Sequence, residues 1–88
     1  MTSALMQRFP DAAWIDASAL VYGNVTIGEG ASLWPGVVIR AEALSVTIGR
    51  FANLQDQVMV HIGYGTPTAI GDYASITHRV VLHGCTIG

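Results

Sequence analysis

The chain has 88 residues, a formal net charge of −2, and four arginines but no lysine. The scattered arginines exclude a basic patch for nucleic acid or for an acidic membrane, and no apolar run is long enough to span a bilayer. The single cysteine, Cys85, excludes an internal disulfide, and the first residues lack the layout of a secretion signal, so we expect a cytoplasmic protein. Because 51% of the residues are hydrophobic and 11% are charged, we also expect apolar surface to lie against other copies of the chain.

From Phe9 onward, a bulky apolar residue recurs at every sixth position, with two interruptions. A helix would need spacings of three and four, so this period indicates strands. We call these positions the repeat residues, and they are Phe9, Ile15, Val21, Ile27, Leu33, Ile39, Ile48, Leu54, Val60, Ile70, Ile76 and Leu82. From Ile15 on, a small or β-branched residue stands two positions before each of them: Ala13, Ala19, Val25, Ala31, Val37, Val46, Ala52, Val58, Thr68, Ala74 and Val80. The pattern predicts an all-β fold, a parallel β-helix in which each six-residue unit forms a strand and a corner and three units close a triangular coil.

The two interruptions follow the same unit of the coil. The step between repeat residues is nine from Ile39 to Ile48 and ten from Val60 to Ile70, so we expect two loops, at 41–45 and 63–67, that leave the same corner. Three units per coil give about four coils in a single domain, 1–88, and the chain ends as a fifth coil begins. Because an open β-helix end exposes unpaired backbone groups, we expect a truncated β-helix, the N-terminal half of a longer protein.

The residue that follows each repeat residue is expected to point outward at a corner. In the third unit of successive coils these residues are Tyr22, Arg40, His61 and His83. Stacked coils lie about 4.8 Å apart, so Arg40, His61 and His83 should form a ladder along one edge. In the second unit the corresponding residues are Asp16, Trp34, Gln55 and Thr77, with Asp56 and His78 one position later.

The position of His78 decides how the three histidines could share a metal ion. Five residues of extended chain, roughly 16 Å, separate His78 from His83, whereas zinc needs each imidazole nitrogen at about 2.0–2.1 Å. His78 of a second copy, packed edge to edge, could complete a three-histidine site with one open position, which is the catalytic zinc arrangement. A hydrogen-bonded pair of His61 and His83 without metal stays open, as do turn chemistry at 53–56 and an ordinary ion pair of Arg40 with Glu42 or Asp56.

In order along the chain, Val37–Arg40, Asn53–Asp56, His61 and the run from His78 through His83 to Gly88 resemble the γ-class carbonic anhydrase family. The resemblance implies a left-handed β-helix and a homotrimer, in which His61 and His83 of one subunit and His78 of its neighbour hold zinc, or iron or cobalt. It implies that a metal-bound hydroxide at the subunit interface hydrates carbon dioxide reversibly to bicarbonate. It also implies that the C-terminal coils and a closing helix of the family are missing here.

The resemblance extends to further side chains. Gln55 would orient the metal-bound hydroxide with Asn53 nearby, and Arg40 and Asp56 would pair across the subunit boundary. Glu42 stands where the family usually has aspartate, so the intersubunit pairing is expected to differ.

Two further departures concern activity. Thr77 replaces a common glycine beside the metal, and Ile62–Gly65 replaces the acidic loop that moves protons in active members.

Two other functions fit the same repeat. One is a hexapeptide-repeat acyltransferase or a thioester-handling relative, which uses one histidine and a coenzyme A cleft between subunits. The other is a non-catalytic trimeric scaffold that binds metal, if at all, for stability. Three histidines that converge with Gln55 favour the carbonic anhydrase reading.

Overall fold

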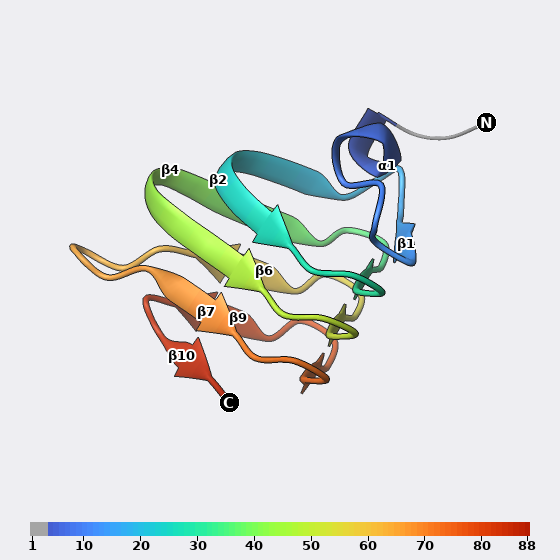
Figure 1. Cartoon of the computed structure of the whole chain (residues 1–88). Helices are drawn as coiled ribbons and strands as arrows, with labels where there is room; N and C mark the ends of the chain where they lie inside the picture. Colours follow the sequence, from blue (N-terminus) through green and yellow to red (C-terminus); the bar gives the residue numbers. More distant parts are fainter. Residues whose placement is uncertain (1–3) are drawn as a thin grey trace.

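The computed structural model describes residues 4–88, which form a stack of parallel coils with residue 4 and residue 88 at opposite ends of the stack (Figure 1). A short helix, α1, comes first, and short strands follow it. Their bounds are α1 Ala4–Arg8, β1 Trp14–Ile15, β2 Leu20–Ile27, β3 Ser32–Leu33, β4 Val38–Ile48, β5 Asn53–Leu54, β6 Met59–His61, β7 Thr68–Ile70, β8 Ser75–Ile76, β9 Val81–His83 and β10 Thr86–Ile87. Within 4–88, no helix is long and apolar enough to cross a membrane.

The strands stack into three walls, and every pairing within a wall is parallel. Wall 1 contains the ends of β2 and β4 with β7 and β10, wall 2 contains β1, β3, β5 and β8, and wall 3 contains the starts of β2 and β4 with β6 and β9. After the first coil, in which the described residues form no strand on wall 1, each coil adds one strand to each wall, and β10 begins a fifth coil on wall 1. The fold is thus a left-handed parallel β-helix of about four coils, as the repeat and the family resemblance predict.

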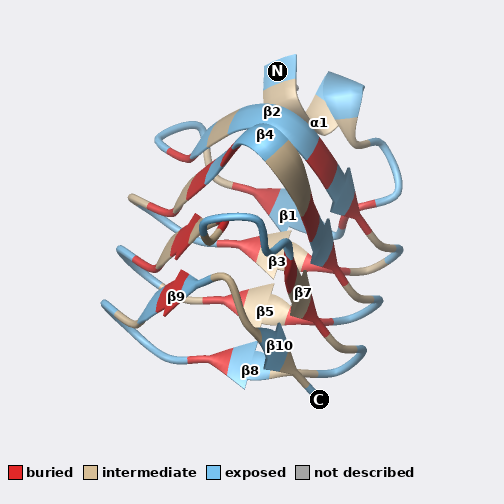
Figure 2. Cartoon of the chain, turned by 90° about the vertical axis from the view of Figure 1, so that its left-hand side faces the viewer, coloured by how far each residue is buried: buried red, intermediate tan, exposed pale blue. Residues whose placement is uncertain are grey.

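The repeat residues fill the interior, and they stack in register from coil to coil. Ile15, Leu33, Leu54 and Ile76 align on wall 2, for example, and each is buried. Figure 2 shows buried positions recurring at the same places in successive coils, with exposed residues along the corners. This alternation of inward and outward side chains along each strand decides which residues reach the surface.

The first unit departs from the prediction. Helix α1 and a turn replace the strand that Phe9 was expected to begin, and Leu5, Met6 and Phe9 pack against the end of the core instead. Ala13 was predicted to be inward, but it is exposed, while Ala12 is buried. The chain enters the first coil from a turn, and the strand register shared with the later units begins only at Trp14.

The two interruptions do leave the same corner, but only one of them is a loop. β4 continues unbroken through 41–45 from wall 3 to wall 1, and the extra residues form a bulge opposite 23–25 of β2. The prediction of a loop there is wrong, because β2 pairs with β4 on both sides of the bulge. Residues 63–67 form a tight turn closed by hydrogen bonds between Gly63 and Thr66.

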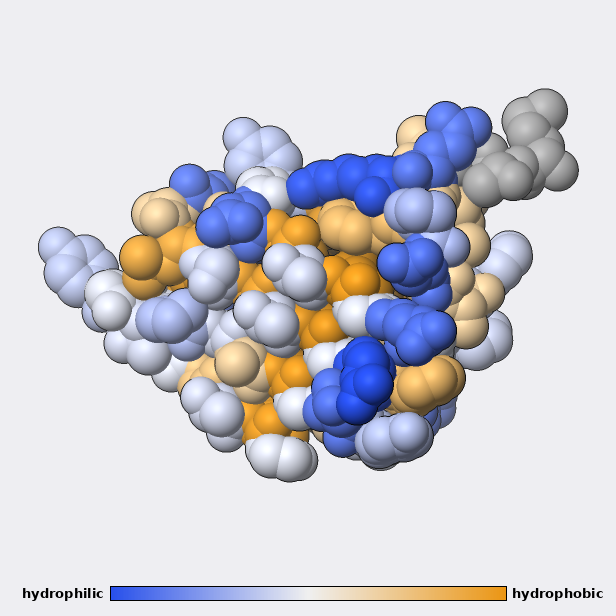
Figure 3. All heavy atoms as spheres, in the orientation of Figure 1, coloured by the Kyte–Doolittle hydropathy of each residue, from blue (hydrophilic) through white to orange (hydrophobic). Residues whose placement is uncertain are grey.

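Wall 1 faces the viewer in the space-filling view (Figure 3). Apolar residues run down the middle of this face, and hydrophilic atoms gather along one side of it. At the corner after wall 1, Arg50 pairs with Asp72 of the next coil at 3.4 Å. The three histidines do not lie on wall 1. They lie along the two borders of wall 3.

Candidate metal centre

One border of wall 3 carries the predicted histidine ladder, which we call the His61 edge. Arg40 pairs with His61, and His61 with His83, as direct neighbours in the parallel register of β4, β6 and β9. Each residue follows a buried repeat residue, so its side chain points outward. The sequence prediction of this ladder is confirmed.

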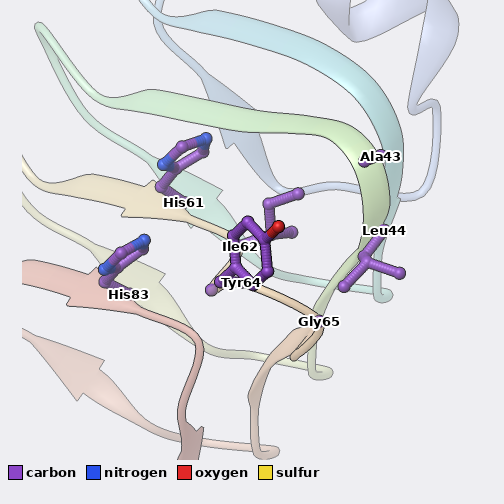
Figure 4. A pocket seen from close by; sticks show the side chains of 8 residues that line it. Ala43, Leu44, His61, Ile62, Tyr64, Gly65 and His83 are labelled. Carbon is purple, nitrogen blue, oxygen red and sulfur yellow. The ribbon is translucent and has the colours of Figure 1, made fainter.

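The rings of His61 and His83 lie face to face. Their centroids are 5.4 Å apart and the ring planes differ by 8°, close to the spacing that adjacent strands impose. Figure 4 shows the two rings leaving β6 and β9 in the same direction. Two parallel imidazoles present matching nitrogens toward one side, and a modest tilt of the rings would bring both within reach of one ion.

The two rings line an open pocket of about 500 Å³. The rest of the lining comes from the bulge of β4 and the turn after β6: Ala43, Leu44, Ile62, Gly63, Tyr64 and Gly65. Figure 4 shows Ile62 and Tyr64 beside the rings, with Ala43 and Leu44 across from them. Both chain interruptions thus serve to wall one side of the histidine pair.

Glu42 connects His61 to Arg40. Its Oε1 lies 2.9 Å from Nε2 of His61, and its Oε2 accepts a hydrogen bond from Nε of Arg40 at 2.8 Å. A second guanidinium nitrogen completes an ion pair between Arg40 and Glu42. The hydrogen bond from its own backbone amide, assisted by Arg40 and His61 and opposed by desolvation, lowers the pKa of Glu42 below its ordinary value. Within one chain, then, a carboxylate holds one ring nitrogen of His61, and Glu42 is the partner of Arg40.

The other border of wall 3 is the corner that follows β5 and β8, and we call it the His78 edge. Gln55 donates from Nε2 to Oδ1 of Asn53 at 3.2 Å and to the hydroxyl of Ser75 at 3.4 Å. Ser75 in turn donates to Oδ1 of Asn53 at 3.2 Å. Sequence reasoning missed Ser75, although its register with Asn53 follows from the repeat.

His78 itself stands at the outer limit of this edge. Its Nδ1 lies 3.7 Å from Oδ1 of Asp56, and its side chain is 66% exposed. The next residue, Arg79, has a positive φ of 61°, as does Gln57 one coil earlier with 64°, and Nε of Arg79 donates to Oε1 of Gln57 at 2.7 Å. These paired turns hold the corner in a fixed shape and leave the His78 ring facing solvent.

The structure therefore divides the predicted site residues between two edges. His61, His83, Arg40 and Glu42 lie together on one, and Asn53, Gln55, Asp56 and His78 lie together on the other. Among the residues that the structure describes, no group of three or more His, Cys, Asp or Glu side chains is placed to hold a metal ion. A three-histidine centre would need edges from two chains.

Known proteins give this arrangement a context. Residues 10–41 match the family described as "Bacterial transferase hexapeptide (six repeats)". The "Probable carbonic anhydrase" of Methanocaldococcus jannaschii is 47% identical over 73 residues, which cover 83% of this chain and 46% of that protein. "Gamma carbonic anhydrase 3, mitochondrial" of Arabidopsis thaliana is 41% identical over 81 residues, or 85% of this chain and 31% of that protein. "Protein YrdA" of Escherichia coli is also 41% identical over 81 residues, or 84% of this chain and 44% of that protein.

The chain resembles proteins named carbonic anhydrase, one of them of the γ class, over 83–85% of its own length. It spans less than half the length of these relatives. These similarities confirm the resemblance on which the site residues were predicted, and relatives of this kind imply a metal cofactor. The ligand roles of His61, His78 and His83 in this γ carbonic anhydrase-like chain stay predictions.

Proposed function

We propose that this protein is a γ carbonic anhydrase-like metalloenzyme that hydrates carbon dioxide reversibly to bicarbonate, at sites shared between the subunits of a homotrimer. The observation that carries the proposal is the stacked pair of His61 and His83 on one border of wall 3, with His78 on the opposite border. Two ligands from one chain and a third from its neighbour give a three-histidine set with an open position for water and substrate.

The donor chemistry suits the proposed ion. Three neutral imidazoles favour zinc, with iron or cobalt as alternatives that the same ligands accept. The contact from Glu42 to His61 supplies the carboxylate partner that ligating histidines usually have. A bound ion would supply Lewis acidity, which makes a water molecule acidic enough to ionise near neutral pH.

The surface between the two edges supports a homotrimer. Leu20, Val38, Met59 and Val81 are register neighbours in an apolar column on wall 3. Leu20 is 63% exposed and Val81 67% exposed, which is unusual for a column of this kind in a monomer. If wall 3 of each subunit faced a threefold axis, this column would be covered and the His61 edge of one subunit would meet the His78 edge of the next.

In such a trimer the remaining residues take distinct tasks. Gln55 and Asn53 would arrive with His78 of the neighbour, and the Gln55 amide could orient the reacting water by a hydrogen bond. Asp56 would arrive beside Arg40, which already holds Glu42, so one guanidinium would link both chains. The largely apolar pocket beside the rings suits carbon dioxide, a small molecule without charge.

A transferase is the second candidate, and the family match at 10–41 is the observation that favours it. A hexapeptide-repeat acyltransferase or thioester-handling protein would use one of the histidines as a base and bind acyl-CoA between subunits. A non-catalytic trimeric scaffold would bind neither acyl-CoA nor carbon dioxide productively. The compartment also stays a prediction: the sequence favours the cytoplasm, whereas several relatives from Arabidopsis thaliana are named mitochondrial.

Elemental analysis of the purified protein, with its mass measured in the same solution, tests the proposal. We expect about one zinc, iron or cobalt ion per chain in a trimer, and bicarbonate formation from carbon dioxide by stopped flow. A trimer that contains no metal, cannot be loaded with it and binds acyl-CoA would favour the transferase. A metal-loaded trimer with neither activity would favour the scaffold.

A further inference from the structure

Thr68 is a polar residue in the otherwise apolar interior of the coils. It is 1% exposed, and no other polar or charged residue within 4–88 is buried. It occupies the inward position of wall 1 where the preceding coils have Val25 and Val46. A hydroxyl in an apolar interior is costly unless it is hydrogen-bonded, so its partners show what it does.

Both partners of the Thr68 hydroxyl are backbone groups at the ends of the histidine strands. Oγ1 donates to the backbone oxygen of His61 at 2.6 Å and accepts from the backbone N–H of Gly84 at 2.8 Å. Gly84 immediately follows His83. One buried side chain therefore joins the end of β6 to the residue that follows β9, next to the backbone of both histidines.

The backbone around this contact leaves little freedom. Gly84 has a positive φ of 58°, and a Cβ placed on it would lie 2.6 Å from the Cα of Gly63. Its N–H also lies 3.2 Å from the oxygen of His61. The hydroxyl of Thr68 completes a three-membered set of hydrogen bonds that fixes where each histidine leaves its strand.

We propose that Thr68 is a positioning residue, which sets the separation and parallel alignment of the His61 and His83 rings through the backbone and so prepares them to bind a metal ion. The metal part of this inference rests on the proposed function. The alignment part does not, because it concerns the rings in the metal-free protein.

The test compares Thr68→Val, which keeps the shape and removes the hydroxyl, with Thr68→Ser, which keeps the hydroxyl. Thr47→Val is the matched control, because Thr47 lies on the same wall but points outward to solvent. Each purified protein is freed of bound metal with a chelator, titrated with cobalt(II) and followed by its visible absorption. Ring proton shifts of His61 and His83 are recorded by NMR without metal.

Thr68→Val should weaken cobalt binding by about 10- to 100-fold, as loss of an outer partner of a ligand does. It should also change the cobalt spectrum and the ring shifts of both histidines. Thr68→Ser and Thr47→Val should match the unaltered protein in all three readouts. This difference from Thr68→Val should hold even if Thr68→Val and Thr47→Val lower the free energy of unfolding by similar amounts.

Two results separate the possible failures. If Thr68→Val keeps the cobalt affinity, the spectrum and the ring shifts of the unaltered protein, the positioning role is wrong and the proposed function stands. If the unaltered protein takes up no cobalt but Thr68→Val still shifts both rings, the positioning role stands and the proposed metal function falls.

Discussion

The two borders of wall 3 both carry histidines, but the contacts that hold those histidines within the chain differ greatly. On the His61 edge, the ring of His61 is 31% exposed, stacks on His83 and contacts Glu42, while Thr68 bonds the strands beneath. On the His78 edge, the His78 side chain is 66% exposed and its Nδ1 lies 3.7 Å from Oδ1 of Asp56. The first border is organised within the chain, whereas the second offers a histidine that has little reason to be ordered until another chain packs against it.

This contrast has an electrostatic counterpart. The His61 edge carries an exposed ion pair of Arg40 with Glu42, and Glu42 also contacts the ring of His61. Such contacts are worth little by themselves in water. Burial against a second subunit would strengthen them, because the effective dielectric falls. Assembly would thus complete the ligand set and reinforce the partners of His61 at the same time.

Removal of either kind of histidine should have the largest effect. His61→Ala removes a ligand from the organised border, and His78→Ala removes the ligand from the exposed one. In a three-ligand site both should reduce the metal content from about one ion per chain to near zero, while the trimer persists. Metal analysis and solution mass check this, and substantial metal in His78→Ala alone would mean that the organised border binds the ion unaided.

A charge in the apolar column of wall 3 should have the next largest effect. Val81→Asp places a carboxylate where the proposed interface is dry, at a cost of several kcal/mol. We expect the protein to dissociate and to lose its metal, as measured by sedimentation at several concentrations. Thr47→Asp, on the exposed face of wall 1, should leave the mass unchanged. A trimeric Val81→Asp protein would move the interface away from wall 3.

A methyl group at the turn beside His83 should have an intermediate effect. Gly84→Ala adds a Cβ 2.6 Å from the Cα of Gly63, whereas at Gly65, which has a similar positive φ of 75°, nothing lies within 4 Å. Both substitutions place an alanine at a positive φ, which costs stability. The additional loss of stability in Gly84→Ala therefore measures how tightly the backbone packs at the His61 edge. We expect about 1–3 kcal/mol more loss of stability than for Gly65→Ala, from denaturant unfolding at equal protein concentration. Equal losses would show that this edge yields easily.

The smallest effect concerns Asp16, which lies two coils before Gln55 on the same corner. Hydrogen bonds from the hydroxyl and amide of Ser18 lower the pKa of Asp16 below its ordinary value of 3.8. The stabilisation is therefore complete above that value and is lost as the pH falls through the lowered pKa. The thermal midpoint should fall slightly more between pH 7 and acid in the unaltered protein than in Asp16→Asn. An identical pH dependence of the thermal midpoint in both proteins would mean that the charge of Asp16 does not stabilise this corner.

The sequence predicted the parts of this structure that depend on period alone. A six-residue step assigns each residue to the interior or the surface, so the three walls, the ladder of Arg40, His61 and His83, and the placement of His78 on another corner all followed. Helix α1 and the exposed Ala13 were not predicted, because the first unit is not flanked by a coil on both sides. The continuous strand at 41–45 was missed because its pairing depends on β2, which has no insertion of its own.

The contacts that individual side chains make could not be predicted from the six-residue period. Thr68 was predicted to be a small inward residue, and nothing in the spacing shows that its hydroxyl reaches the oxygen of His61 and the amide of Gly84. The link from Glu42 to His61 depends on how far the bulge of β4 turns the carboxylate. An inward threonine one wall after a paired histidine is a signal that could have been used.

Mixing two damaged chains tests the shared site most directly. Chains with His78→Ala and chains with His83→Ala are unfolded together in equal amounts, refolded and assayed for bound metal. Neither variant alone should hold metal, but random assembly should give roughly one quarter of the interfaces an intact His61 and His83 from one chain and an intact His78 from the other. Recovery of that fraction supports a centre between subunits. Trimers that re-form without any metal, or metal held by either variant alone, would contradict it.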